Sequence, residues 1–113
     1  MTFKAFDVVV VPFPFTDSAA TKRRPAVVLS AQGFNDRAAH LVLAMITSIE
    51  NRGWPLDVEL RDLAGAGLSH PSLVRMKLFT LDERFVLRKA GVLAAADRAA
   101  VRRALAMLLP AKE

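Results

Sequence analysis

The first half of the chain consists of short apolar runs that are separated by polar or proline-containing segments. Residues 8–11 are four consecutive valines, and residues 25–30 and 40–47 are two further runs made mostly of apolar side chains. β-branched residues favour extended backbone, and a short continuous apolar run is typical of a strand that is covered on both faces. We therefore expect three buried strands in this half of the chain.

The second half begins with a different pattern. Residues 56–60 read L-D-V-E-L, and this alternation predicts a half-buried strand with Asp57 and Glu59 facing outward. Residues 72–79 predict a fifth strand, and residues 85–88 a short sixth. Segments rich in small, polar or glycine residues separate the strands and predict loops, turns or a short helical excursion. These segments are residues 16–22, 32–37, 51–55 and 64–71.

The C-terminal segment has helical periodicity. Within residues 94–109, Val101, Leu105 and Leu108 fall on one helical face, and Pro110 ends the pattern. A chain of 113 residues fits one domain, residues 1–113. Several short strands followed by one helix predict a mainly β (α+β) fold, a small barrel or strongly bent sheet with the helix packed on it.

The charge balance favours an anionic partner. Lysine and arginine outnumber the acidic residues 16 to 11, which gives a net charge of +5. Such a basic domain suits a nucleic acid, an acidic peptide or a membrane surface. The chain has no cysteine, so thiol nucleophiles and thiolate metal sites are excluded. The longest apolar runs are too short to cross a bilayer, and we expect a cytoplasmic protein with no membrane partner.

The two histidines do not have the spacing of a metal site. We therefore predict no metal and no cofactor. His40 and His70 could still act together as a general acid and base, as in a metal-independent ribonuclease. The simpler interpretation places His40 at the end of a strand and leaves His70 solvated in a loop.

The densest positive charge lies at the start of the second expected strand, where Lys22, Arg23 and Arg24 precede Pro25. A guanidinium group binds phosphate through two parallel hydrogen bonds, and the following proline restricts the backbone of Arg24 to extended conformations. A solvated charge run is the alternative. Residues 47 and 48, a threonine and a serine at the end of the third strand, could likewise simply cap a turn.

Three segments together resemble the MazF/PemK family, the toxins of bacterial type II toxin–antitoxin pairs. The first is FDVVVVPFPFTDSAATKRRPAVVLS, which resembles the family's opening strand, polar loop and R-P strand. The second is AMITS with the following WPLDVEL, and the third is GLSHPSLVRMKLFTLD. The similarity spans roughly residues 6 to 109. Phe6 stands where the family usually has glycine.

The resemblance implies an SH3-like β-barrel of five to six strands with a C-terminal α-helix, usually as a homodimer. It also implies metal-independent, sequence-selective cleavage of single-stranded RNA to 2′,3′-cyclic phosphate and 5′-OH ends, neutralised by a cognate antitoxin. The family's active-site arginine and hydroxyl residue match Arg24 and Thr47 in this chain. The residues expected to bind the RNA are Lys22, Arg23, Ser48, Phe15 and Arg75, and the loop from Phe15 to Thr21 is expected to shape base selection.

Two other functions remain open at this point. A member of this family could bind RNA or an antitoxin without cutting, and gyrase-directed toxins use the same barrel against a protein target. The presence of both Arg24 and Thr47 favours the endoribonuclease, because a protein-directed toxin needs no phosphate chemistry.

Overall fold

The computed structural model describes residues 2–12 and 22–112. The described chain forms one six-stranded antiparallel sheet with three α-helices and two short 3-10 helices. In chain order the elements are β1 (Asp7–Pro12), β2 (Arg23–Val28), α1 (Gln32–Ala38), β3 (His40–Ser48), η1 (Ile49–Asn51), β4 (Val58–Glu59), α2 (Leu63–Ala66), β5 (Ser72–Asp82), η2 (Glu83–Phe85), β6 (Arg88–Val92) and α3 (Ala95–Leu108).

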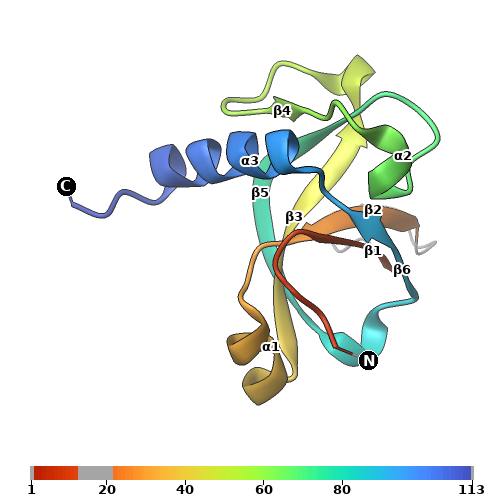
Figure 1. Cartoon of the computed structure of the whole chain (residues 1–113), viewed down its shortest axis with the longest axis vertical. Helices are drawn as coiled ribbons and strands as arrows, with labels where there is room; N and C mark the ends of the chain where they lie inside the picture. The colour runs from red at the N-terminus through yellow and green to blue at the C-terminus, as the bar shows by residue number, and fades with distance from the viewer. Residues whose placement is uncertain (1, 13–21, 113) are drawn as a thin grey trace.

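The sheet has the strand order β4-β5-β3-β2-β1-β6 and curls into an open barrel, with α3 packed across one side (Figure 1). β3 and β5 pair along their whole length, with a register shift between Ala44 and Met45. A second shift, between Val8 and Val9, occurs where β1 pairs with β6. Such irregularities bend strands and increase their twist, which helps a sheet of this size to curl. The predicted bent sheet with a terminal helix is confirmed.

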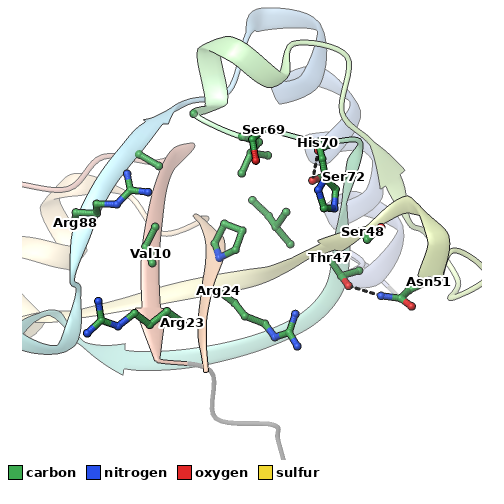
Figure 2. Close-up of a pocket in the computed structure, with 15 residues that line it drawn as sticks. Val10, Arg23, Arg24, Thr47, Ser48, Asn51, Ser69, His70, Ser72 and Arg88 are labelled. Carbon is green, nitrogen blue, oxygen red and sulfur yellow. Dashed lines mark hydrogen bonds between the residues drawn. The ribbon is translucent and has the colours of Figure 1, made fainter. Parts of the chain in front are cut away.

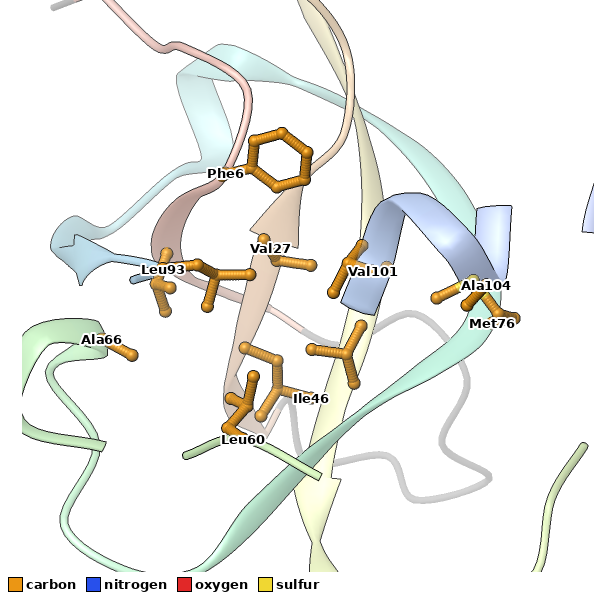
Figure 3. Packing of buried hydrophobic residues seen from close by; sticks show 12 residues of the cluster. Phe6, Val27, Ile46, Leu60, Ala66, Met76, Leu93, Val101 and Ala104 are labelled. Carbon is orange, nitrogen blue, oxygen red and sulfur yellow. The ribbon is translucent and has the colours of Figure 1, made fainter. Parts of the chain in front are cut away.

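Both faces of the central strands are buried. One cluster of buried side chains lies between the sheet, α2 and α3 (Figure 3), and includes Val8, Val27 and Val101. A second cluster on the other face includes Val9 and Val28. Neighbouring valines of one strand thus pack into different clusters, because successive side chains of a strand point to opposite faces. This confirms the interpretation of the apolar runs as strands covered on both faces.

Three expectations need correction. The strand predicted at residues 56–60 is only Val58–Glu59, and Asp57 faces inward because its carboxylate pairs with Arg75. The sixth strand is Arg88–Val92 instead of 85–88, since its backbone pairs with β1 despite its polar sequence. The connector at 64–71 contains the short helix α2, whose first turn is capped by a side chain from residue 62.

Two close contacts fix α2 and the segment that leads into it. A Cβ atom at Gly91 would collide with the carbonyl oxygen of Gly65, so β6 and α2 approach closely only because a side chain is absent there. At the start of α3, the buried carboxylate of Asp97 accepts hydrogen bonds from the backbone N–H groups of Arg61 and Asp62. The segment from residue 61 to residue 66 is therefore held between β6 and α3.

Candidate functional site

A cleft of about 340 Å³ lies between the ends of β2 and β3 and the loop that follows α2 (Figure 2). The sheet supplies its floor, and residues 67–72 form its opposite wall. The lining residues are Val10, Arg23, Arg24, Pro25, Ile46, Thr47, Ser48, Asn51, Gly67, Leu68, Ser69, His70, Ser72, Arg88 and Ala90.

The strand register brings Arg24 and Thr47 together. β2 and β3 pair with Ala26 opposite Met45 and Val27 opposite Ala44. Continuing this antiparallel register by two residues from Ala26 places Arg24 opposite Thr47, and residues that face each other across two strands lie on the same face of the sheet. In Figure 2 the side chain of Arg24 extends toward the side of the cleft that holds Thr47. Thr47 itself is only 5% exposed.

The hydroxyl groups at the end of β3 have different surroundings. The Thr47 Oγ1 atom accepts a hydrogen bond of 2.9 Å from the side-chain amide of Asn51. Ser48 caps η1, because its Oγ atom accepts from the backbone N–H of Glu50 at 3.2 Å. The turn-capping role that was the alternative for this pair of residues therefore belongs to Ser48. Thr47 instead lies in the cleft wall with Asn51 beside it (Figure 2).

The charge of the lining is positive. Arg23, Arg24 and Arg88 contribute three guanidinium groups, and none of the lining residues in the described part of the chain is acidic. Clefts lined by one sign of charge concentrate ligands of the opposite sign. On the far wall, Ser72 donates a 2.7 Å hydrogen bond to the carbonyl oxygen of His70, which fixes the loop that carries the imidazole ring. The site is suited to a polyanion.

The remaining predicted RNA-binding residues are not among the described residues that line the cleft. Lys22 is exposed just outside β2 and does not line the cleft. Arg75 does not line it either. Phe15, with the loop to Thr21, lies outside the described residues. The roles of these residues stay predictions.

Arg75 lies behind the cleft wall, in contact with three other residues. Its guanidinium pairs with Asp57 at 3.0 Å, and it donates a 2.7 Å hydrogen bond to the carbonyl oxygen of Asn51. Its charge also lies 5.4 Å from the ring centroid of Trp54. Most of its hydrogen-bonding capacity is thereby directed to the protein itself.

The two histidines do not meet. His40 begins β3 and contacts the Ala38 carbonyl oxygen, whereas His70 lines the cleft near the other end of that strand. An acid–base pair of these two residues is therefore ruled out. Within residues 2–12 and 22–112, no group of three or more histidine or acidic side chains is arranged to hold a metal ion. None of the helices in that part of the chain is long and apolar enough to cross a membrane.

Several lining residues were not predicted as site residues, and Asn51 and Arg88 are the two that bear on the chemistry. Asn51 follows Thr47 by four residues, on a 3-10 turn that the sequence pattern indicated only as a break. The sequence analysis placed Arg88 at the end of a strand at residues 85–88, whereas the strand begins at Arg88. With the wrong strand bounds, the position of Arg88 at the cleft could not be predicted. A polar residue on the turn directly after an active-site strand is the signal that could have identified Asn51.

Comparison with known proteins identifies the family of this chain. Residues 4–109 match the family model described as PemK-like, MazF-like toxin of type II toxin–antitoxin system. The chain belongs to this family. A search of curated proteins gave no match.

Solved structures of MazF proteins share the fold. The MazE–MazF structure (Form-III) from Deinococcus radiodurans is 27% identical, with a TM-score of 0.76 over 96% of this chain and 97% of that chain. The Mycobacterium tuberculosis toxin MazF-mt6 is 21% identical, with a TM-score of 0.75 over 95% and 99%. An endoribonuclease in complex with its cognate antitoxin, from a mycobacterial species, is 16% identical, with a TM-score of 0.76 over 99% and 97%. The predicted MazF-type barrel with a C-terminal helix is confirmed.

Proposed function

We propose that this toxin-family protein is a metal-independent, sequence-selective endoribonuclease that cuts single-stranded RNA. The supporting observation is the register of β2 and β3, which, continued by two residues, places Arg24 opposite Thr47 in a cleft whose described lining contains three arginines and no carboxylate. A guanidinium and a hydroxyl on adjacent strands form a rigid pair of donors. Such a pair suits a reaction that builds negative charge on phosphate oxygens.

The reaction we propose is an internal transfer. The ribose 2′-oxygen forms a bond to the adjacent phosphorus, and the bond from phosphorus to the 5′-oxygen of the next nucleotide breaks. The 2′-hydroxyl loses a proton and the departing 5′-oxygen gains one, leaving a 2′,3′-cyclic phosphate and a 5′-OH end. Arg24 and Thr47 stabilise the charge on the non-bridging oxygens. Each such donor contributes about 10²–10³ in rate.

Proton transfer requires a different group. Arginine stays protonated in proteins and is a poor general base. An imidazole is the side chain that most often transfers protons in catalysis, and His70 places one in the cleft (Figure 2). We therefore assign proton transfer to His70. His70→Gln is expected to lower kcat more than it raises KM, because the glutamine side chain cannot transfer a proton.

The test is cleavage of a long unstructured RNA in excess EDTA, with the product ends mapped. Wild type is compared with Arg24→Ala, the nearly isosteric Thr47→Val, and Arg103→Ala, which removes an exposed arginine on α3 away from the cleft. We expect wild type to cut at a short recurrent sequence. The cleavage rate is expected to fall about 10²–10³-fold in Arg24→Ala and in Thr47→Val, and to stay the same in Arg103→Ala.

Two results would contradict this proposal. Cutting that persists unchanged in Arg24→Ala would show that the activity comes from another site or from a contaminant. If folded wild type cuts none of a varied set of RNAs, the protein is instead a non-catalytic binder or a protein-directed toxin.

We further propose a cognate antitoxin and a homodimer, both acting in the cytoplasm. One of the similar structures is an endoribonuclease in complex with its cognate antitoxin, and another is a MazE–MazF structure. An acidic antitoxin segment fits the arginine-lined cleft. The exposed side chain of Leu109, directly after α3, lines an apolar groove, and we assign this groove to the contact with the second copy. Light scattering is expected to give twice the mass of one chain, and an acidic antitoxin peptide is expected to compete with RNA. A monomer, or a peptide that binds without displacing RNA, would contradict these assignments.

A further inference from the structure

The side chain of Asn51 restricts the direction in which the Thr47 hydroxyl can donate. A threonine hydroxyl has one proton and two lone pairs, whereas an amide nitrogen can only donate. Because the Asn51 nitrogen donates to Thr47 Oγ1 at 2.9 Å, it occupies one lone pair and cannot receive the threonine proton. That proton must find another acceptor. Thr47 lines the cleft, so a phosphate oxygen bound beside it would offer such an acceptor.

Asn51 is itself held on both sides. Ser48 caps the start of the 3-10 turn η1, and Asn51 ends it. The backbone carbonyl of Asn51 accepts a 2.7 Å hydrogen bond from Arg75. The Arg75 guanidinium is anchored by Asp57 through contacts of 3.1 and 3.0 Å, and the two side chains are only 12% and 10% exposed. A chain of contacts thus runs from Asp57 through Arg75 and Asn51 to Thr47.

We infer that Asn51 is a positioning residue that aims the Thr47 proton at the scissile phosphate, and that Arg75 and Asp57 hold Asn51 in place from behind the cleft wall. This inference rests on the proposed ribonuclease function. It also gives Arg75 a role different from the RNA contact that the family resemblance implies. A residue that acts through Thr47 affects the rate of the chemical step, whereas a residue that contacts RNA affects binding as well.

The first measurement is a double-mutant cycle on the single-turnover cleavage rate. Asn51→Ala is expected to slow wild type about tenfold, because Thr47 keeps its hydroxyl and loses one neutral hydrogen bond. In a Thr47→Val background the same change is expected to cost less than about twofold, since no threonine proton remains to be aimed. Affinity for an uncleavable RNA with 2′-deoxy positions is expected to stay the same.

Asn51→Asp gives a sharper test, because it conserves shape and reverses the hydrogen bond. A carboxylate only accepts, so the Thr47 proton would turn toward it and away from the phosphate. If Asn51 only filled space, Asn51→Asp would be milder than Asn51→Ala. We expect Asn51→Asp to be slower than Asn51→Ala, with a cleavage rate reduced about 10²-fold. In the Thr47→Val background this reduction is expected to shrink to the effect of the added negative charge alone. Gln32→Glu makes the same amide-to-carboxylate change at an exposed position on α1 and is expected to have no effect.

Arg75→Met separates the two roles considered for Arg75. A positioning role predicts a slower rate with unchanged affinity, and little further loss in an Asn51→Ala background. A direct RNA contact predicts weaker binding that persists in that background, and this result would overturn the positioning role of Arg75.

A spectroscopic measurement tests the hydrogen bond without activity. The side-chain amide signals of Asn51 in a ¹⁵N spectrum are expected to move in Thr47→Val and to stay in place in Gln32→Glu. Unchanged amide signals in Thr47→Val, or additive rate losses in the double-mutant cycle, would overturn the inference while leaving the ribonuclease proposal intact. A folded wild type that cuts no RNA would overturn both together.

Discussion

Replacement of Asp97 by alanine tests how α3 supports the cleft. The Asp97 carboxylate is 1% exposed and accepts hydrogen bonds from the backbone N–H groups of Arg61, at 3.0 and 3.1 Å, and of Asp62, at 3.0 Å. These contacts join the first turn of α3 to the segment that leads into α2. The loop after α2 carries Ser69 and His70, which line the cleft. Loss of the carboxylate is therefore expected mainly to lower the free energy of unfolding, and to a smaller extent to loosen the loop that forms the cleft wall.

The size of the effect follows from the two donors left behind. A buried N–H group without an acceptor costs about 1–3 kcal/mol. Arg61 and Asp62 are exposed residues, so water can reach part of their backbone after the change, and the lower half of that range applies. Two donors then give a loss of about 2–4 kcal/mol. For a domain of this size the corresponding fall in Tm is about 10–20 °C.

Urea unfolding, followed through circular dichroism and the fluorescence of Trp54, measures this loss directly. Asp97→Asn is the matched variant, since its amide keeps one acceptor oxygen, and its loss is expected to be about half as large. A loss below about 1 kcal/mol for Asp97→Ala would refute the reasoning, because it would mean that neither donor depends on the carboxylate.

Three further changes test other parts of the fold. Gly91→Ala places a methyl group against the backbone of α2, and it is expected to lower the free energy of unfolding in urea by about 1–3 kcal/mol and to weaken RNA binding. The control Gly33→Ala places its methyl group in open space on α1, and its free energy of unfolding is expected to be unchanged or higher. Phe6 is buried and has a φ of 73°, a backbone conformation that glycine adopts without strain. Phe6→Gly is therefore expected to lower the free energy of unfolding by about 2–3 kcal/mol, less than Phe6→Ala. A Phe6→Ala variant more stable than Phe6→Gly would contradict the backbone strain. At Asp82, the hydrogen bond from the backbone N–H of Arg84 lowers the pKa of the carboxyl group. The ionised carboxylate therefore stabilises the folded protein above its ordinary pKa, and this stabilisation is lost as the pH falls through the lowered pKa. The Tm difference between wild type and Asp82→Ala should accordingly shrink below about pH 4, and a difference that grows with acid would contradict this sign.

The strands that hold the site could be predicted because their apolar runs are strong signals. Four consecutive valines and the run at residues 40–47 each became central strands with both faces covered. The terminal helix was predicted at 94–109 and is found at Ala95–Leu108, with Val101 buried as the periodicity indicated. Apolar runs and helical periodicity of this kind are the strongest signals of secondary structure that a sequence contains.

The weaker elements depend on tertiary contacts that no local pattern contains. β6 reads R-K-A-G-V and forms a strand because β1 offers it an unpaired edge. Asp57 was expected to face outward from an alternating strand, but the positive charge of Arg75 draws it inward. The role of Asn51 depends on a turn whose end is fixed by that same arginine, 24 residues further along the chain. Sequence reasoning finds such residues only after the fold is known.

The proposed active-site geometry depends on the core through strand register. Arg24 lies opposite Thr47 because Ala26 pairs with Met45 and Val27 with Ala44. A slip of one residue would turn every side chain of β2 to the opposite face, so that Val27 and Val28, each now 0% exposed, would leave the clusters in which they are packed. The apolar runs that bury both faces therefore also hold the arginine and the hydroxyl in line with each other. For this reason a strand deep in the sheet is a better support for a charge-stabilising arginine than a surface loop, where nothing would penalise a shift of one position.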